Sequence, residues 1–168
     1  MGFNIPSWDE YFIGMAFFVS MRSKDAQTKH GAIIVDESNI VLGMGYNSFA
    51  RGLPDEEYPS TRPEKYPYMI HAEENAIFNC NVNLRSMKNI RLYVTGSCCF
   101  NCIQRVAQVG IKKIIFADRV GTVLEDGKMK AKFEKFANDQ KMELITLPVN
   151  FKGIIEYLSS FGGLSHEQ

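Results

Sequence analysis

The sequence predicts an α/β fold in which one sheet lies between layers of helices. Two observations support this prediction. The chain has 168 residues, of which 45% are hydrophobic, enough for one core but too few for two ordinary domains. Segments patterned as helices alternate with short segments patterned as strands along most of the chain. We therefore expect residues 1–168 to form a single domain, with right-handed crossovers between its parallel strands.

The N-terminal part predicts a helix followed by a hairpin. Ser7 and Glu10 have the spacing of a capping box, and apolar residues then recur at helical spacing, so we expect a helix over about 8–22. Two strands are expected at 31–36 and 39–46. The short polar turn between them indicates that they pair as a hairpin.

The remainder of the chain predicts seven further elements. They are helices at about 72–81, 99–109, 128–140 and 151–160, and strands at 90–95, 112–117 and 142–147. Together with the hairpin they form an α/β sandwich with five strands. Residues 161–168 are expected to be a flexible tail.

A long loop, residues 51–68, separates the hairpin from the helix at 72–81. It is rich in proline and charged residues and has no periodicity. Loops of this length in compact domains are usually either functional or disordered. Because this one leads directly to His71, we expect it to act as a lid or a contact between subunits.

The composition favours a small-molecule substrate. With 19 basic and 19 acidic residues the chain has no net charge, so we expect no nucleic-acid partner. The longest apolar run, about Tyr11 to Met21, is too short to span a bilayer, so we expect no membrane segment. Asp9 and Glu10 precede this run, where a signal peptide carries positive charge. We therefore expect a cytoplasmic protein, whose cysteines stay reduced.

Three residues have the chemistry and spacing of a catalytic zinc site. His71-Ala72-Glu73 opens one predicted helix, and Cys99-Phe100-Asn101-Cys102 opens the next. Cysteines at i and i+3 share one helix face, and a thiolate at a helix N-terminus has a lowered pKa, which favours metal binding. A catalytic zinc keeps three protein ligands and leaves the fourth position for water. We therefore predict one zinc per chain, bound by His71, Cys99 and Cys102.

Glu73 is the predicted general acid and base. A site with three ligands does not need this carboxylate to hold the metal, whereas an activated water needs a proton acceptor. Glu74 points about 100° away on the helix, so we expect it to be solvated or salt-bridged. Cys80 falls on an apolar helix face and is expected to be buried, and Cys98 is expected to point away from the metal. A Cys-x-x-Cys pair alone would equally suit a redox pair or half a zinc ribbon.

An H-x-E motif followed by C-x-x-C resembles the signature of zinc deaminases of the cytidine deaminase superfamily. Further segments narrow the resemblance to the deoxycytidylate (dCMP) deaminases, and it covers about residues 10–120. These segments are Arg22–Val35, Gly45–Asn47, Lys65–Tyr68 and Val106–Lys113. The resemblance implies a three-layer α/β/α sandwich of the cytidine deaminase type, with a five-stranded mixed sheet in the order 2-1-3-4-5.

The resemblance also implies the reaction, which is hydrolytic deamination of dCMP to dUMP with release of ammonia, supplying dUMP for thymidylate synthesis. Glu73 would pass a proton from the activated water to ring N3 and then protonate the departing amine. The backbone N–H of Ala72 would bind the base carbonyl, and the carbonyl of Ser97 would bind the amino group. Asn47 would bind the deoxyribose.

Phosphate groups require cations, and Arg22 and Lys24 lie in one basic run, so we expect them to bind the substrate phosphate. The alternative is that they are solvated residues at a helix C-terminus, where the dipole favours positive charge. By resemblance, the protein would be a homohexamer activated by dCTP and inhibited by dTTP. Arg51, at the start of the long loop, is the expected effector contact.

The sequence departs from the family pattern at four positions. Cys98 replaces the proline that usually precedes the first cysteine ligand, Ser48 and Ala50 replace the last markers of Gly-Tyr-Asn-Gly-x-Pro, and Val120 stands where many relatives have tyrosine. Because the altered loop lies near substrate and effector in the family, dCTP is an alternative substrate, alone or beside dCMP. A tRNA or free-base deaminase and a non-catalytic zinc-binding regulator are the remaining alternatives.

Overall fold

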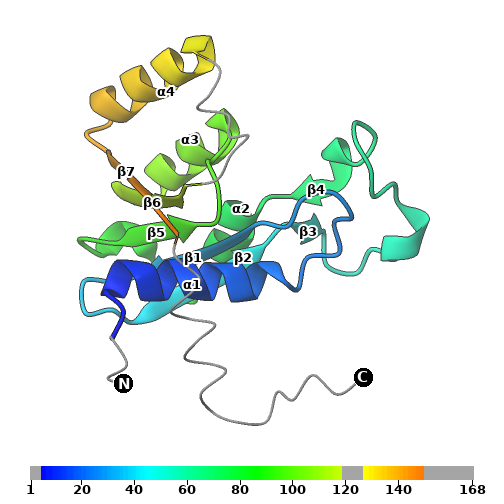
Figure 1. Ribbon diagram of the computed structural model, residues 1–168, viewed down its shortest axis with the longest axis horizontal. Coiled ribbons are helices and arrows are strands. Elements are labelled where there is room, and N and C mark those ends of the chain that lie inside the picture. Colours follow the sequence, from blue (N-terminus) through cyan, green and yellow to red (C-terminus); the bar gives the residue numbers. More distant parts are fainter. Residues whose placement is uncertain (1–4, 119–126, 150–168) are drawn as a thin grey trace.

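The computed structural model describes residues 5–118 and 127–149 (Figure 1). The predicted helix at 151–160, the predicted tail at 161–168 and Val120 lie outside the described residues. In the described part, a five-stranded sheet, a two-stranded ribbon and four α-helices are present. No described helix is long and apolar enough to cross a membrane.

The central sheet is formed by β1 (Gly31–Val35), β2 (Val41–Tyr46), β5 (Arg91–Val94), β6 (Lys113–Ala117) and β7 (Glu143–Leu147). It is mixed, with two antiparallel pairs at one end and two parallel pairs at the other. β1 pairs antiparallel with both β2 and β5, whereas β5, β6 and β7 run parallel. The order across the sheet is β2-β1-β5-β6-β7, which is 2-1-3-4-5 when these five strands are numbered along the chain, so the expected order is confirmed.

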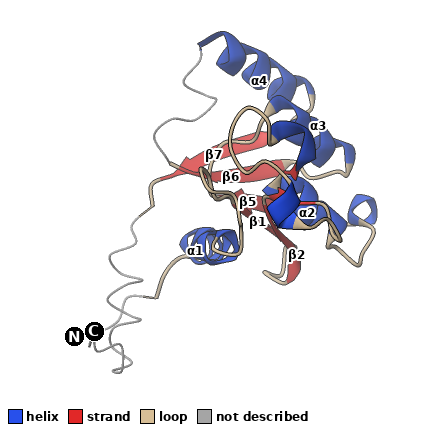
Figure 2. Cartoon of the chain, turned by 90° about the vertical axis from the view of Figure 1, so that its right-hand side faces the viewer, coloured by secondary structure: helices blue, strands red, loops and turns tan. Residues whose placement is uncertain are grey.

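Helices cover both faces of the sheet. α1 (Trp8–Ser20) lies on one face, and α2 (Ala72–Phe78), α3 (Phe100–Gln108) and α4 (Gly127–Asp139) lie on the other (Figure 2). All five residues of β1 are buried, as expected for a central strand with both faces covered. Alternate side chains therefore enter two separate cores: Ile33 packs beneath α1, and Ile34 packs beneath the other three helices.

The element ends agree with the predicted ends to within three residues. The predicted capping box is present at the start of α1: the backbone N–H of Ser7 donates to the Glu10 carboxylate at 2.8 Å, and that of Glu10 donates to the Ser7 hydroxyl. The largest difference is in α2, which ends at Phe78 because Asn79 already caps it.

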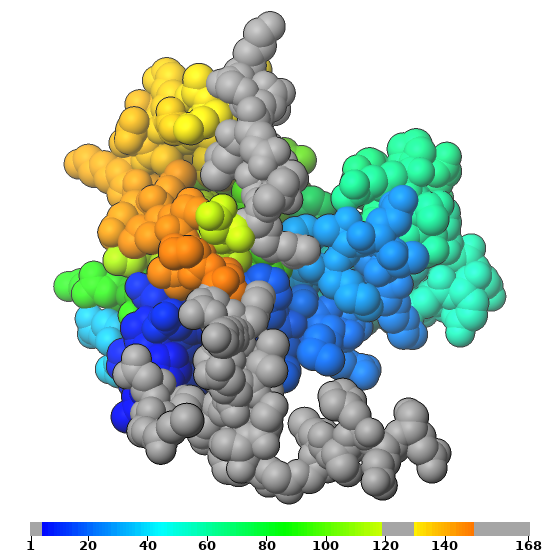
Figure 3. Space-filling view, in the orientation of Figure 1, coloured from blue at the N-terminus to red at the C-terminus, as the bar shows by residue number. Residues whose placement is uncertain are grey.

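The sequence does not predict the two-stranded ribbon formed by β3 (Ser48–Phe49) and β4 (Met69–Ile70). Strands of two residues are too short to show an alternating pattern. The ribbon closes the base of the long loop, which also contains the short 3₁₀ helices η1 (Asp55–Glu57) and η2 (Tyr66–Tyr68). The loop projects to one side of the molecule (Figure 3), and β4 leads directly from it into α2.

Candidate metal centre

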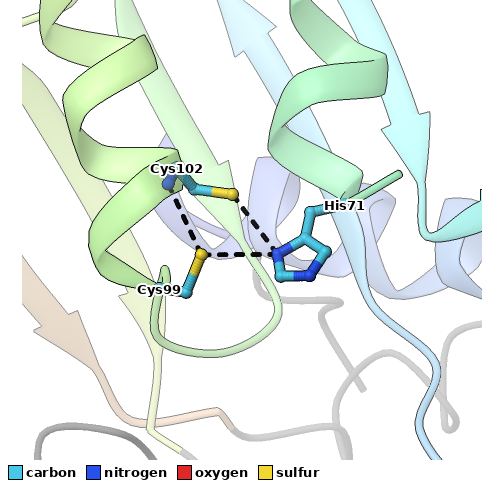
Figure 4. Close-up of side chains that lie close together, drawn as sticks. All are labelled: His71, Cys99 and Cys102. Carbon is cyan, nitrogen blue, oxygen red and sulfur yellow. Dashed lines mark hydrogen bonds between the residues drawn. The ribbon is translucent and has the colours of Figure 1, made fainter. Parts of the chain in front are cut away.

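His71, Cys99 and Cys102 meet where the N-terminal ends of α2 and α3 approach each other (Figure 4). The Nδ1 atom of His71 lies 3.5 Å from Sγ of Cys99 and 3.3 Å from Sγ of Cys102. All three donor atoms lie within 4.8 Å of one another, and no other group of three histidine, cysteine or acidic side chains in the described part of the chain is gathered in this way. The structure thus brings together the three predicted ligands.

Helix capping places these ligands. His71 is the N-cap of α2 and Cys99 is the N-cap of α3, and both have extended backbone conformations, with ψ of 158° and 166°. The Cys99 sulfur turns back over the first turn of α3 and accepts a hydrogen bond from the backbone N–H of Cys102 at 3.4 Å. The backbone N–H of His71 donates to the Glu74 carboxylate at 3.2 Å. Two helix N-termini, each favourable to negative charge, therefore converge on one point.

Hydrogen bonds among the three donor side chains shift their pKa values. The hydrogen bond with the side chain of Cys102 is the main cause that lowers the pKa of Cys99 to about 4, and the hydrogen bond with the His71 side chain adds to this effect. The hydrogen bond with Cys99 is also the main cause that raises the pKa of Cys102, and the main cause that raises the pKa of His71. The Cys99 thiolate is thus stabilised by its contacts with Cys102 and His71, and a cation bound at the same point would also stabilise it.

The donor set fits zinc. In a tetrahedral site with the usual Zn–N and Zn–S bond lengths, nitrogen and sulfur ligands lie about 3.6 Å apart. The two nitrogen–sulfur separations here, 3.5 and 3.3 Å, are close to that value. One imidazole and two thiolates leave a fourth position for water or substrate, so the geometry suits a catalytic rather than a closed structural site.

The two neighbouring glutamates have different environments. Glu73 is only 4% exposed, and burial raises the pKa of its carboxyl group. Glu74 is bound by Arg105, with 3.0 Å between Arg105 Nε and the carboxylate, so the expected salt bridge of Glu74 is confirmed. Cys98 is fully buried; burial, followed by the charge of Glu73 and a hydrogen bond to it, raises the pKa of its thiol. Cys98 therefore contacts the predicted base.

The other predicted substrate contacts lie in different surroundings. Ala72 is the fully buried first residue of α2, and Ser97 lies half-buried in the connection from β5 to α3. Both are therefore within two residues of a ligand. The Asn47 side chain is 6% exposed; its amide NH₂ donates to the Asp25 carboxylate and to the Thr28 carbonyl. Its deoxyribose contact stays a prediction.

The basic residues Arg22, Lys24 and Arg51 line a single cavity of about 360 Å³. The sequence suggested two separate sites, with Arg22 and Lys24 at the substrate phosphate and Arg51 at an effector. None of the three metal ligands lines this cavity, and α2 contributes Asn75 and Asn79 to it. Arg51 donates to the Asn79 side-chain oxygen at 2.5 Å, and Lys24 forms an ion pair with Asp55.

Two further features of the structure have no clear signal in the sequence. Lys65 and Asp25 form a buried ion pair, although lysine and aspartate are rarely buried. The His30 ring lies over Gly96, three residues before Cys99. A glycine close to the end of a strand can indicate a close approach by another group, and Gly96 is the one sequence signal for this contact.

Residues 6–118 match the family model described as the cytidine and deoxycytidylate deaminase zinc-binding region. Deoxycytidylate deaminase of Homo sapiens is 40% identical over 115 residues, which cover 65% of this chain and 64% of that protein. The chain thus spans just under two thirds of the length of this relative. Deoxycytidylate deaminase of Mycobacterium phage D29 is 30% identical over 127 residues, which cover 66% of this chain and 94% of that protein.

Two solved structures share the fold. The dCMP deaminase of cyanophage S-TIM5, crystallised with dCMP and dUMP, is 22% identical with a TM-score of 0.62, covering 86% of this chain and 99% of that one. The guanine deaminase of Nitrosomonas europaea is 12% identical with a TM-score of 0.53, covering 87% of each chain. At these identities the likeness concerns the fold alone.

Proposed function

This chain belongs to the cytidine and deoxycytidylate deaminase family, and on that premise we propose that it converts dCMP to dUMP and releases ammonia. One observation carries the proposal: the cluster of His71, Cys99 and Cys102 has the buried carboxylate Glu73 beside it. A regulator that merely bound zinc would have no use for such a carboxylate, because burying it without a function is costly.

Zinc held by these three ligands would lower the pKa of a coordinated water to about 7. The chain itself supplies the proton transfer. Glu73 accepts a proton from water at its carboxylate and delivers it to ring N3 of the cytosine while the oxygen of that water bonds to C4. It then takes the second proton from the hydroxyl group on C4 and gives it to the amine, which leaves as ammonia when the C4–N bond breaks. Because burial raises the pKa of Glu73, this group holds the proton between the two transfers more readily than an exposed glutamate would.

The helix ends orient the base. The first N–H groups of an α-helix have no partner within the helix, so the N–H of Ala72, at the start of α2, suits the base carbonyl. The carbonyl of Ser97, two residues before Cys99, suits the amino group that leaves. These contacts would place the C4 atom of the base in front of the metal ligands.

A panel of cytosine compounds tests the activity. Purified zinc-loaded protein is given dCMP, CMP, dCTP, deoxycytidine, cytosine or a tRNA, and released ammonia is measured. We expect dCMP to have the highest kcat/KM and the Glu73→Gln variant to release no ammonia above background on this scale. Faster release from dCTP would favour the alternative substrate, and release from none of them would refute the proposed activity.

The cavity between the long loop and α2 supports a proposal about regulation. Arg22, Lys24 and Arg51 line it and the metal ligands do not, so we assign it to a triphosphate effector rather than to the substrate phosphate. We propose that dCTP activates and dTTP inhibits a homohexamer through this cavity.

Saturation curves test the regulation. We expect a sigmoidal dCMP curve that dCTP shifts to lower and dTTP to higher concentration, and Arg51→Ala should abolish both shifts. Conversion of dCTP to dUTP is followed in the same samples, and light scattering gives the mass of the assembly. Hyperbolic curves that neither triphosphate moves, or a mass other than six chains, would contradict the respective part of the proposal.

A further inference from the structure

An almost completely buried ion pair connects the long loop to the rest of the domain. The ammonium of Lys65 lies 2.6 Å from each carboxylate oxygen of Asp25, and both side chains are 3% exposed. Lys65 immediately precedes η2, whereas Asp25 lies in the connection between α1 and β1. The pair therefore joins the returning end of the loop to a segment far away in the sequence.

Asp25 organises the segment around it. One of its oxygens accepts the backbone N–H groups of Gln27 at 2.8 Å and Thr28 at 3.0 Å. The other accepts the side-chain amide of Asn47 at 3.1 Å. Burial alone would raise the pKa of Asp25, but Lys65 and the backbone donors outweigh it, and the pKa lies below its usual value. Asp25 is thus held as a carboxylate.

The Asn47 side chain connects Asp25 to the backbone of His30. The Asn47 side-chain oxygen accepts the backbone N–H of His30 at 2.7 Å, and the backbone N–H of Asn47 donates to the His30 carbonyl at 3.2 Å. Both the backbone N–H and the backbone carbonyl of His30 are therefore bound by Asn47, which fixes the position of this residue.

The His30 ring in turn packs on the segment that carries the metal ligands. A Cβ atom built on Gly96 would lie 2.9 Å from Cε1 and 3.2 Å from Nδ1 of this ring, so the ring occupies the space above Gly96. The same two segments are joined by two hydrogen bonds: the Gly31 N–H donates to the Thr95 hydroxyl at 3.0 Å, and the Thr95 N–H donates to the Gly31 carbonyl at 3.1 Å. The segment 95–98 leads directly into Cys99.

Stability alone does not account for this network. The cost of removing two charges from water offsets much of their attraction, and an apolar pair of similar volume is often as stable as a buried ion pair. An apolar pair, however, makes no directional hydrogen bonds. It could not fix the orientation of the Asn47 side chain, and through it the position of residue 30.

We propose that Lys65 is a positioning residue, which acts through Asp25, Asn47 and His30 to fix the backbone of residues 95–98 beside the metal ligands. The inference rests on the proposed deaminase function, since that backbone borders the position of the cytosine base. Misplacement of about 1 Å at such a site can cost on the order of 10²-fold in kcat/KM.

The test replaces the ion pair by apolar residues of similar length, Asp25→Leu with Lys65→Met. We expect this double variant to bind one zinc and to keep a melting temperature close to that of the wild type. Its kcat/KM for dCMP should nevertheless fall at least tenfold. Most of the loss should appear in KM, because the metal ligands and Glu73, which act in the chemical step, are unchanged. Backbone amides of residues 95–98 should exchange hydrogen faster, as measured by mass spectrometry.

A second variant tests the route and does not require the buried pair to be replaced. His30→Ala removes a half-buried ring, and it should raise KM and speed exchange at 95–98 in the same way. Combined with the Asp25→Leu and Lys65→Met changes, it should add little further loss, because the changes act along one path. An unchanged KM and unchanged exchange in His30→Ala would overturn the proposal.

The matched control removes a surface ion pair, Lys113→Gln with Glu143→Gln, which joins β6 to β7 at 3.2 Å. It should leave kcat/KM and exchange at 95–98 unchanged. The proposal is refuted if the Asp25→Leu, Lys65→Met variant folds and behaves like this control. If the wild type deaminates no cytosine compound, the proposed function fails, and the exchange comparison alone then decides whether Lys65 positions the segment.

Discussion

At the scale of single residues, burial and pairing distinguish two adjacent carboxylates. Glu73 is buried beside the ligands, whereas Glu74 is bound by Arg105, which is itself half exposed, and caps the backbone N–H of His71. Glu73→Gln should therefore keep zinc and fold but lose at least the 10²-fold in kcat typical of a general acid and base. The measurements are zinc content, circular dichroism and ammonia release.

Glu74→Gln is the matched control for this prediction. Glutamine still accepts the His71 N–H, and only a partly exposed ion pair is lost, which contributes about 1 kcal/mol or less. Its activity should stay within a few-fold of the wild type. Equal losses in the two variants would mean that Glu73 is not the proton carrier.

At the scale of elements, the site depends on how closely α2 packs on β2. A Cβ atom at Gly45 would lie 2.2 Å from the backbone nitrogen of Ala76 and 2.4 Å from the carbonyl oxygen of Ala72. Gly45→Ala must push away the helix that begins at His71, so we expect a loss of about 1–3 kcal/mol in unfolding free energy and weaker zinc binding. Met44→Ala, at a half-exposed neighbour on the same strand, should change neither. Thermal melts and metal titration measure both effects.

The connection between α1 and β1 gives a prediction about acid stability. The pKa of Asp25 is lower in the folded protein than the value of about 3.9 in an unfolded chain. Its contribution to stability is therefore complete above about pH 4 and is lost as the pH falls through the folded value. Below about pH 4 the melting temperature of the wild type should fall more steeply than that of the Asp25→Leu, Lys65→Met variant. Parallel curves from pH 7 to 2.5 would contradict this assignment.

At the scale of the whole molecule, zinc should stabilise the fold, because its ligands come from two helices that are assembled only in the native state. A ligand that binds only the folded protein stabilises it by about 2.7 kcal/mol at a hundred times its Kd. A chelator should therefore lower the melting temperature, and added zinc should restore it. Metal analysis should find one zinc per chain.

The double variant Cys99→Ser, Cys102→Ser is the control for the zinc prediction. It removes both sulfur donors with little change in volume, so its melting temperature should not respond to the chelator. A chelator response that persists in this variant, or two tightly bound zincs in the wild type, would place the metal elsewhere.

The sequence determined the longer helices and strands and the set of metal ligands. The two cores follow from the apolar runs of the strands, and His71, Cys99 and Cys102 were identifiable because a metal restricts both donor type and spacing. Helix capping places His71 at the start of α2, and Cys99 and Cys102 at the start of α3. The packing of α2 against α3 then brings the two helix starts together. The separation of Glu73 from Glu74 likewise follows from the angle between successive residues on a helix.

Only the tertiary structure decided which polar residues of distant segments come together. Burial of Lys65 against Asp25, the contact of His30 with Gly96 and the placement of Arg22, Lys24 and Arg51 in one cavity all join segments from different parts of the chain. Such pairings leave no periodicity and no spacing rule, because a polar side chain finds its partner only after the sheet has brought the loops together. The ribbon of β3 and β4 arises in the same way, from pairing between strands too short to have a pattern of their own.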